Sequence, residues 1–409
     1  MPSSRTPGKS AAPRRSKAAA GRGSPTEALR PQGVLEPEPP PARTKKRAAR
    51  RAVRGSGPVA VDLALQGGGA HGAFTWGVLD RLLEDESIAL DGVSGSSAGA
   101  LNAAVLATGW ADGGRAGARA ALHAFWHDVG GSASGCFGEV SIDPWAAFTH
   151  FSPLPIEQPL AAFNLDQNPG YVWLAEFLRH VSPYQFGAHG PERLGTVVRA
   201  HVREDALRGG PLTLFVTATA VQTGRPRVFT GDALSIDALL ASSCLPQLFR
   251  AVSIDGEPYW DGGYSGNPAL WPLIYQTAAT DLLLVKVSPL QRAGTPETAA
   301  EIADRVNEIT FNAGLVAEMR AIHFVQRLLA DGRVDPGHYK SLRLHMVADD
   351  DGLAPLAASS KMNTDWRFLQ RLHAMGRAAA DRWLDAHRAD LGQRSTLDLG
   401  TTFLAGRDV

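Results

Sequence analysis

Residues 59–72 read VAVDLALQGGGAHG, and this stretch decides the fold. Its first part is a short, mostly apolar run that is typical of a strand buried inside a sheet. A glycine-rich turn follows at once, and apolar residues then recur at helical spacing from Phe74 to Leu82. Strand, glycine turn and helix in this order predict an α/β fold around a mostly parallel sheet.

A second unit of the same kind comes next. Residues 91–94 predict a brief strand, residues 95–99 a turn, and residues 100–108 an alanine-rich helix. The turn reads GSSAG and matches G-x-S-x-G, in which the flanking glycines avoid a Cβ clash. Such a turn projects the serine hydroxyl at the start of a helix, where developing negative charge is favoured. Ser97 is therefore the candidate nucleophile, and an ordinary Gly/Ser helix cap is the alternative.

The glycine turn fits two kinds of site. Residues 67–72 satisfy G-x-G-x-x-G, the pattern of a dinucleotide-binding turn, which needs an acidic residue about 20 positions further on. Asp91 lies near that distance, but it precedes the next predicted strand instead of ending it. The second kind of site is an oxyanion hole, in which free N–H groups of the turn face a tetrahedral intermediate. The neighbouring G-x-S-x-G favours the oxyanion hole.

A serine nucleophile needs a base. None of the 12 histidines follows a late strand with an acid before it, as an α/β-hydrolase triad would require. A partly desolvated carboxylate can serve instead. Asp261, followed by Gly262 and Gly263 directly after a predicted strand, is the candidate, with a plain turn as the alternative. Asp112 also precedes two glycines, but a helix of ~10 residues separates it from Ser97 by about 15 Å.

The remaining pattern extends the same fold. Residues 110–210 predict a helix-rich insertion, and the loops at 144–173 are candidates for covering the site. Alternating apolar residues and turn signals predict further strands at 213–221, 226–230, 249–254, 258–260, 281–287 and 342–347. Helical spacing predicts helices at 235–242, 296–329 and 365–389. The last of these is amphipathic, so it either packs on the core or forms a lid that faces lipid.

Composition excludes several classes of protein. The chain has 409 residues, with 44% hydrophobic and 20% charged, which is typical of a globular protein with a sizeable core. Its two cysteines exclude a disulfide framework and a four-cysteine zinc site. No stretch approaches the ~18 apolar residues of a membrane-spanning helix, and the N-terminus has no secretory signal pattern.

The net charge of zero hides an asymmetry. Residues 1–57 carry 14 Lys and Arg against 3 Asp and Glu, so the rest of the chain is acidic by the same margin. This basic head has few large apolar residues and is expected to be disordered. It is a solubilising tail, a tether to anionic membrane through the cluster at 44–54, or an organelle transit peptide. No zinc-finger spacing or aromatic–basic interleaving suggests nucleic-acid binding.

These blocks resemble one family, the patatin-like phospholipases, over about residues 60–290. The resemblance rests on the glycine loop at 67–72, the GSSAG turn, the Asp261 triplet and their order, and residues 241–249 look like a further family segment. It implies a three-layer α/β catalytic domain over residues 58–290, followed by a mostly helical extension over 291–409. The extension is similar to those of some bacterial patatin-like proteins.

The resemblance also implies a chemistry. Ser97 would attack an acyl carbonyl, and Asp261 would take its proton and return it to the leaving alcohol, with no metal or other cofactor. The oxyanion hole would use N–H groups around Gly68, Gly69 and Ala70. The glycine positions of the motifs are Gly67, Gly72, Gly95, Gly99, Gly262 and Gly263. His71 stands where many members carry Arg or Lys, so a phosphate headgroup preference does not follow.

The expected function is hydrolysis of lipid carboxylic esters, like that of a phospholipase A or lysophospholipase, by a cytoplasmic bacterial protein. Peripheral association with an anionic membrane through the basic head is an option. Three alternatives stay open. They are a thioester or storage-polyester hydrolase, a non-enzymatic lipid-binding protein, and a dinucleotide-dependent oxidoreductase.

Overall fold

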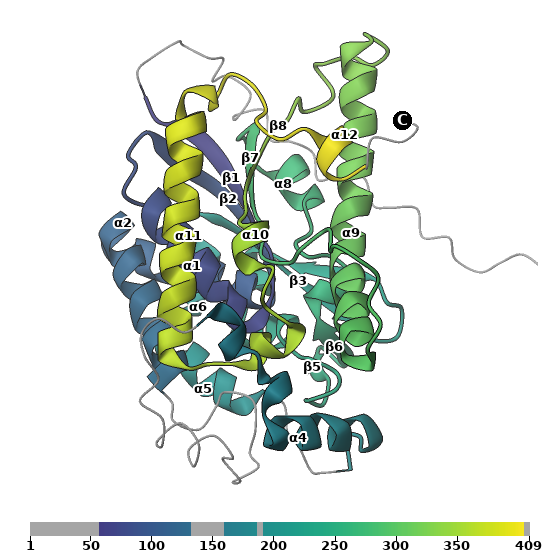
Figure 1. Cartoon of the computed structure of the whole chain (residues 1–409). Coiled ribbons are helices and arrows are strands. Elements are labelled where there is room, and N and C mark those ends of the chain that lie inside the picture. Colours follow the sequence, from purple (N-terminus) through teal and green to yellow (C-terminus); the bar gives the residue numbers. More distant parts are fainter. Residues whose placement is uncertain (1–56, 132–158, 186–190, 405–409) are drawn as a thin grey trace, which may run out of the picture. The chain divides into compact units, whose positions relative to one another are not determined.

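The computed structural model describes residues 57–131, 159–185 and 191–404 (Figure 1). The predicted disordered head lies outside these residues, except for Gly57. So does the part of the predicted covering loops before residue 159. Among the described residues, no helix combines the length and the apolar character that crossing a membrane requires.

One sheet of eight strands forms the centre of the described structure, in the order β5-β6-β3-β2-β1-β7-β8, with β4 also on β3. The strands β3, β2, β1, β7 and β8 run parallel, whereas β4, β5 and β6 are antiparallel to their neighbours. Their bounds are β1 Val59–Leu65, β2 Ile88–Ser96, β3 Thr213–Ala220, β4 Pro226–Phe229, β5 Val252–Ile254, β6 Glu257–Asp261, β7 Asp281–Val285 and β8 Arg343–Val347.

Helices cover both faces of this sheet (Figure 1). The α-helices are α1 Gly72–Leu82, α2 Ala98–Gly131, α4 Pro169–His180, α5 Glu192–His201, α6 Glu204–Gly209, α7 Ile236–Ser242, α8 Trp271–Gln276, α9 Ala299–Ala330, α10 Asp350–Leu353, α11 Trp366–His387 and α12 Leu399–Thr402. The 3-10 helices are η1 Gly69–His71, η2 Leu160–Phe163, η3 Leu165–Gln167, η4 Gly231–Ala233, η5 Gly262–Tyr264, η6 Ala358–Met362 and η7 Arg388–Asp390. The predicted α/β fold class is confirmed.

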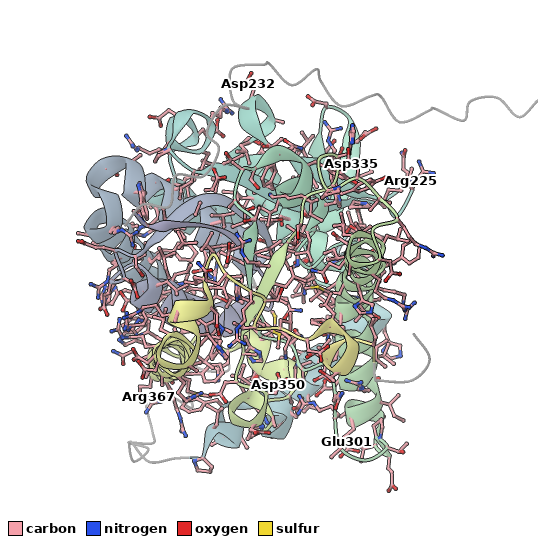
Figure 2. All side chains as sticks on the ribbon, turned by 90° about the horizontal axis from the view of Figure 1, so that it is seen from above. Arg225, Asp232, Glu301, Asp335, Asp350 and Arg367 are labelled. Atoms are coloured by element: carbon pink, nitrogen blue, oxygen red, sulfur yellow. The ribbon has the colours of Figure 1, made fainter. Side chains whose placement is uncertain are left out.

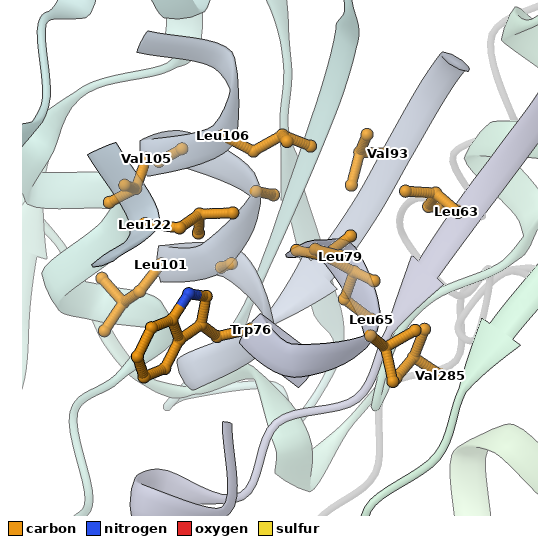
Figure 3. Close-up of a cluster of buried hydrophobic side chains, with 14 of the residues drawn as sticks. Leu63, Leu65, Trp76, Leu79, Val93, Leu101, Val105, Leu106, Leu122 and Val285 are labelled. Carbon is orange, nitrogen blue, oxygen red and sulfur yellow. The ribbon is translucent and has the colours of Figure 1, made fainter. Parts of the chain in front are cut away.

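The hydrophobic core has two parts, one on each face of the sheet. Leu63 and Leu65 of β1 point into the larger core with side chains of α1 and α2 (Figure 3). Residues of α11 complete this core. Ala64 between them points into the smaller core with α8, α9 and α12. Because successive side chains of a strand alternate faces, a strand between two helical layers is mostly apolar. This is why β1 reads as an apolar run, interrupted only by the buried Asp62, which accepts hydrogen bonds from the Gly92 N–H and the Thr277 hydroxyl.

Most charged side chains of the described residues lie at the surface, whereas Asp62, Asp281 and Lys286 are buried. Figure 2 labels six of the exposed charged side chains. They are Arg225, Asp232, Glu301, Asp335, Asp350 and Arg367. Asp261, in contrast, is fully buried. A buried carboxylate is costly unless its surroundings compensate for the lost water, so its position needs an explanation.

The predicted amphipathic helix at 365–389 is α11, and it packs on α1. A Cβ at Gly77 would overlap the carbonyl oxygen of His373, and one at Gly376 would overlap that of Phe74. Phe368 and Leu372 of α11 are fully buried. The apolar residues of α11 are therefore packed against α1 in this structure.

Some element boundaries differ from the prediction. Residues 91–94 are part of the longer strand β2, which the polar Asp91 and the following Gly92 concealed. Residues 100–108 are part of α2, whose non-helical backbone at Gly113 and Gly114 marks a kink. The segment after residue 290 contributes β8 to the central sheet, and the domain boundary at that residue stays a prediction.

Candidate active site

The Ser97 turn is strained. Ser97 lies between β2 and α2 with φ of 52°, a left-handed conformation that costs a non-glycine residue about 1–2 kcal/mol. A Cβ at Gly95 would lie 2.6 Å from the backbone nitrogen of Ala100. A Cβ at Gly99 would overlap the carbonyl oxygen of Leu65. The two glycines therefore allow the turn to form against β1, and the Ser97 side chain keeps partial exposure.

A hydrogen-bond relay holds this turn in place. The Ser97 N–H donates to Ser242 Oγ at 2.9 Å, and the buried Ser242 hydroxyl donates to the Thr217 carbonyl oxygen at 2.6 Å. The relay ties the turn to α7 and to β3. Sequence reasoning assigned no role to Ser242. The only signal was its place in the segment at 241–249, where two consecutive serines gave no indication of which one points inward.

The glycine loop lies directly against the Ser97 turn. The Gly67 N–H donates to Asn267 Oδ1 at 2.6 Å. A Cβ at Gly67 would lie 2.8 Å from Ser97 Cβ, so only glycine allows this approach. Gly69 has φ of 57° and begins η1 with Ala70. The first N–H groups of a helix have no acceptor inside it, so these two are available to a ligand. Sequence reasoning missed Asn267.

The other glycines of the two motifs are just as confined. A Cβ at Gly68 would lie 2.9 Å from Val287 Cγ2, and one at Gly72 would lie 2.7 Å from Ala98 Cβ. The glycine loop and the start of α2 are therefore in contact. The structure brings the predicted oxyanion loop and the predicted nucleophile together at one edge of the sheet, where the parallel strands β1 and β2 end.

Asp261 reaches the same place from the antiparallel strand β6. Its Oδ1 accepts the Gly263 N–H at 2.8 Å, whereas its buried Oδ2 has no hydrogen-bond partner among the described residues. A Cβ at Gly262 would overlap the Thr217 carbonyl oxygen. This carbonyl also anchors the Ser97 turn through Ser242. One residue of β3 therefore supports both halves of the candidate dyad.

The electrostatics of Asp261 suit a base. Burial raises the pKa of this carboxyl from its usual 3.8 to about 6. The Ser97 hydroxyl, the Gly263 N–H and the Lys361 ammonium each lower this pKa in part. The hydroxyl therefore lies beside the carboxyl, although the geometry of a full hydrogen bond is not reached. Catalytic hydrogen bonds often tighten only when substrate binds.

His71 is a buried structural residue. Its Nε2 lies 2.8 Å from Ser360 Oγ, and the Ser360 hydroxyl donates to the Ala357 carbonyl oxygen at 2.7 Å. The Nε2–H of His71 is therefore the donor to Ser360. Burial, with smaller contributions from Lys361 and Arg292, lowers the pKa of His71 to about 3. The imidazole is therefore neutral at physiological pH, and it adds no charge to the glycine loop.

Other candidates from the sequence have different partners. Asp112 is exposed at the α2 kink, where it forms an ion pair with Arg203 at 2.7 Å. The Asp91 carboxylate accepts the N–H groups of Ala278 and Ala279 at 2.7 and 2.9 Å, far from the carboxyl end of β2 where a dinucleotide would bind. Among the described residues no group of His, Cys, Asp and Glu could hold a metal ion.

Comparison with known proteins gives one family. A family model described as patatin-like phospholipase matches residues 63–274. No curated protein matches the chain. VipD from Legionella pneumophila has a similar structure over 81% of this chain and 67% of its own, at 16% identity and a TM-score of 0.32. The type III effector protein ExoU covers 81% of this chain at 17% identity and a TM-score of 0.23, and this chain spans 59% of its length.

Proposed function

The chain belongs to the patatin-like phospholipase family, and on that premise we propose that it is a serine acyl hydrolase acting on carboxylic esters of lipids. The catalytic dyad of this proposal is Ser97 and Asp261. One observation carries it. A serine held in a left-handed turn has its hydroxyl near enough to a fully buried carboxyl group to lower the pKa of that group, and the carboxyl Oδ2 has no hydrogen-bond partner among the described residues. A buried acceptor left free is costly, so such an arrangement points to function.

The acylation step follows from this arrangement. Ser97 Oγ attacks the carbonyl carbon of the ester, and its proton passes to Asp261 Oδ2. The carbonyl oxygen becomes an oxyanion, which the N–H groups of Gly68, Gly69 and Ala70 stabilise. The bond from carbon to the leaving oxygen then breaks. Asp261 returns the proton to that oxygen, so an alcohol leaves and the acyl group stays on Ser97.

Deacylation repeats the same proton transfers with water. Water attacks the acyl carbon while Asp261 takes one of its protons. The new oxyanion occupies the same loop, the bond to Ser97 Oγ breaks, and Asp261 returns the proton to that oxygen. A fatty acid is released. A base works best when its pKa lies near the operating pH, and burial moves the Asp261 pKa to about 6, toward neutrality.

Family membership supports a lipid ester as the substrate, with phospholipase A or lysophospholipase activity as the finer proposal. The dyad specifies acyl transfer and does not discriminate between an oxygen ester, a thioester and a polyester. The intact pair of Ser97 and Asp261 disfavours a non-enzymatic lipid-binding protein. Cytoplasmic localisation and a membrane tether formed by residues 1–57 stay predictions.

Labelling with a fluorophosphonate probe tests the proposal. We expect wild type to label, and Ser97→Ala and Asp261→Asn to lose the label. Asp112→Asn is the matched control, because it changes the same group before the same two glycines and should keep full labelling. Hydrolysis of a lipid-ester panel by the four proteins gives the activity. Absence of label and hydrolysis in folded wild type, with and without anionic liposomes, would contradict the proposal.

A further inference from the structure

A short segment from far along the chain lies on the glycine loop. This segment is η6, and its Ser360 is hydrogen-bonded to His71 at 2.8 Å. A Cβ at Gly69 would overlap the carbonyl oxygen of the next residue, Lys361, and would lie 3.3 Å from its Cβ. The backbone of Lys361 is therefore in contact with the loop that would hold the oxyanion.

The side chain of Lys361 extends from this loop toward the Asp261 loop. Its Nζ donates to Asn307 Oδ1 at 3.1 Å and lies 5.5 Å from the centre of the Phe311 ring. The same ring is so close to Gly263 that a Cβ there would overlap it. Lys361 therefore contacts the glycine loop at its backbone and approaches the carboxyl loop at its ammonium.

Three other charged side chains lie around the Lys361 ammonium. They are Glu308, Asp304 and Arg292. Glu308 is paired with Arg292 at 2.7 Å and with Arg305 at 3.0 Å, and Asp304 accepts the Ala358 N–H at 3.1 Å. Their charges are thus partly compensated by groups other than Lys361.

Among the described residues, Lys361 is the cation whose charge acts on Asp261. The other titratable groups that face this carboxyl are the Cys244 thiol and the Tyr264 phenol. Burial raises the pKa of both, so both are neutral at physiological pH. The uncharged His71 adds no cation to the loop either.

We propose that Lys361 is a positioning residue of the dyad, whose backbone supports the glycine loop and whose ammonium favours the ionised, proton-accepting form of Asp261. This inference rests on the proposed hydrolase function. Removing the ammonium leaves the backbone contact with Gly69 in place, so a side-chain substitution isolates the effect of charge.

The test is the pH dependence of kcat/KM with the soluble ester p-nitrophenyl butyrate. We compare wild type with Lys361→Met, Lys361→Gln and Lys361→Arg. The Met and Gln variants should shift the acid midpoint upward by about 0.5 pH unit or more, which is about a threefold loss on the acid limb. The Arg variant should restore the wild-type midpoint. Gln retains a donor for Asn307 and serves if Met disturbs folding.

Arg367→Met is the control, because it removes one exposed positive charge near η6 without touching the site. Its midpoint should equal that of wild type. Active Met and Gln variants with an unshifted midpoint would overturn the inference and leave the hydrolase proposal intact. A wild type that hydrolyses no ester would overturn the hydrolase proposal, and the inference with it.

Discussion

The buried carboxyl that makes Asp261 a base should also make the folded protein less stable at neutral pH. Burial raises its pKa from 3.8 to about 6. A shift of about 2.2 pKa units corresponds to about 3 kcal/mol. Folding raises this pKa, so the neutral carboxyl contributes to the free energy of unfolding. That contribution is fully present below pH 3.8 and is lost as the pH rises through about 6. Asp261→Asn removes this ionisation, so it should become relatively more stable as the pH rises.

The expected magnitude follows from the two pKa values. Between pH 4.5 and pH 8, the free energy of unfolding of Asp261→Asn minus that of wild type should rise by about 2 kcal/mol. The amide also brings an N–H group to the place where Oδ2 has no partner among the described residues. Its cost of about 1–3 kcal/mol is the same at both pH values and drops out of this comparison.

The assay is urea unfolding of the full chain, followed by tryptophan fluorescence at pH 4.5, 6 and 8. Asp112→Asn is the control, because an exposed ion pair contributes about 0–1 kcal/mol and its removal should give little change with pH. A difference between Asp261→Asn and wild type that stays constant from pH 4.5 to pH 8 would refute the reasoning. It would mean that this carboxyl is no harder to ionise in the folded chain than in the unfolded one.

Four further outcomes are expected. In wild type, kcat/KM should fall about tenfold from pH 7 to pH 5, because Asp261 with a pKa of about 6 loses its charge; a flat profile contradicts this. Gly69→Ala should reduce kcat/KM at least about 100-fold, because its Cβ would overlap the backbone of η6 and displace the oxyanion loop; unchanged kinetics contradict this. Ser242→Ala should cost more free energy in kcat than in the stability of the fold, because the Ser97 N–H loses its acceptor; paired melting and rate measurements check this. Gly376→Ala should cost about 1–3 kcal/mol of stability in urea unfolding, because its Cβ would overlap the backbone of α1, and it should leave the rate per folded molecule unchanged.

The predicted motifs could be placed correctly because their signals are local. An apolar run predicts β1, and the glycines that follow predict a turn whose tight approach only glycine allows. G-x-S-x-G likewise predicts the turn at Ser97, whose φ of 52° lies in the left-handed region. Because β1 and β2 are parallel neighbours, their carboxyl ends meet at one edge of the sheet. The proximity of the glycine loop and the serine thus follows from two short segments.

The partners of these motifs could not be predicted, because they lie far apart in the chain. Ser242 looks like its neighbour Ser243, and only the packing of α7 on β3 turns it toward the Ser97 N–H. No sequence motif marks Lys361 as a positioning residue. This role depends on the contact between η6 and the glycine loop, two segments that lie far apart in the sequence. The amphipathic spacing of α11 favours packing on the core but also fits a lid, and only the contacts with α1 show where the helix lies.

The sequence by itself determined the α/β class, the strand–turn–helix units and the residue types of the candidate dyad. Steric limits on φ and the alternation of side chains act over a few neighbouring residues, so a short segment records them. Only the tertiary structure decided that Asp261 is fully buried with a raised pKa, that His71 is neutral and that a lysine from η6 faces the dyad. Burial and electrostatic potential are sums over every element packed around a group, and no local pattern contains that sum.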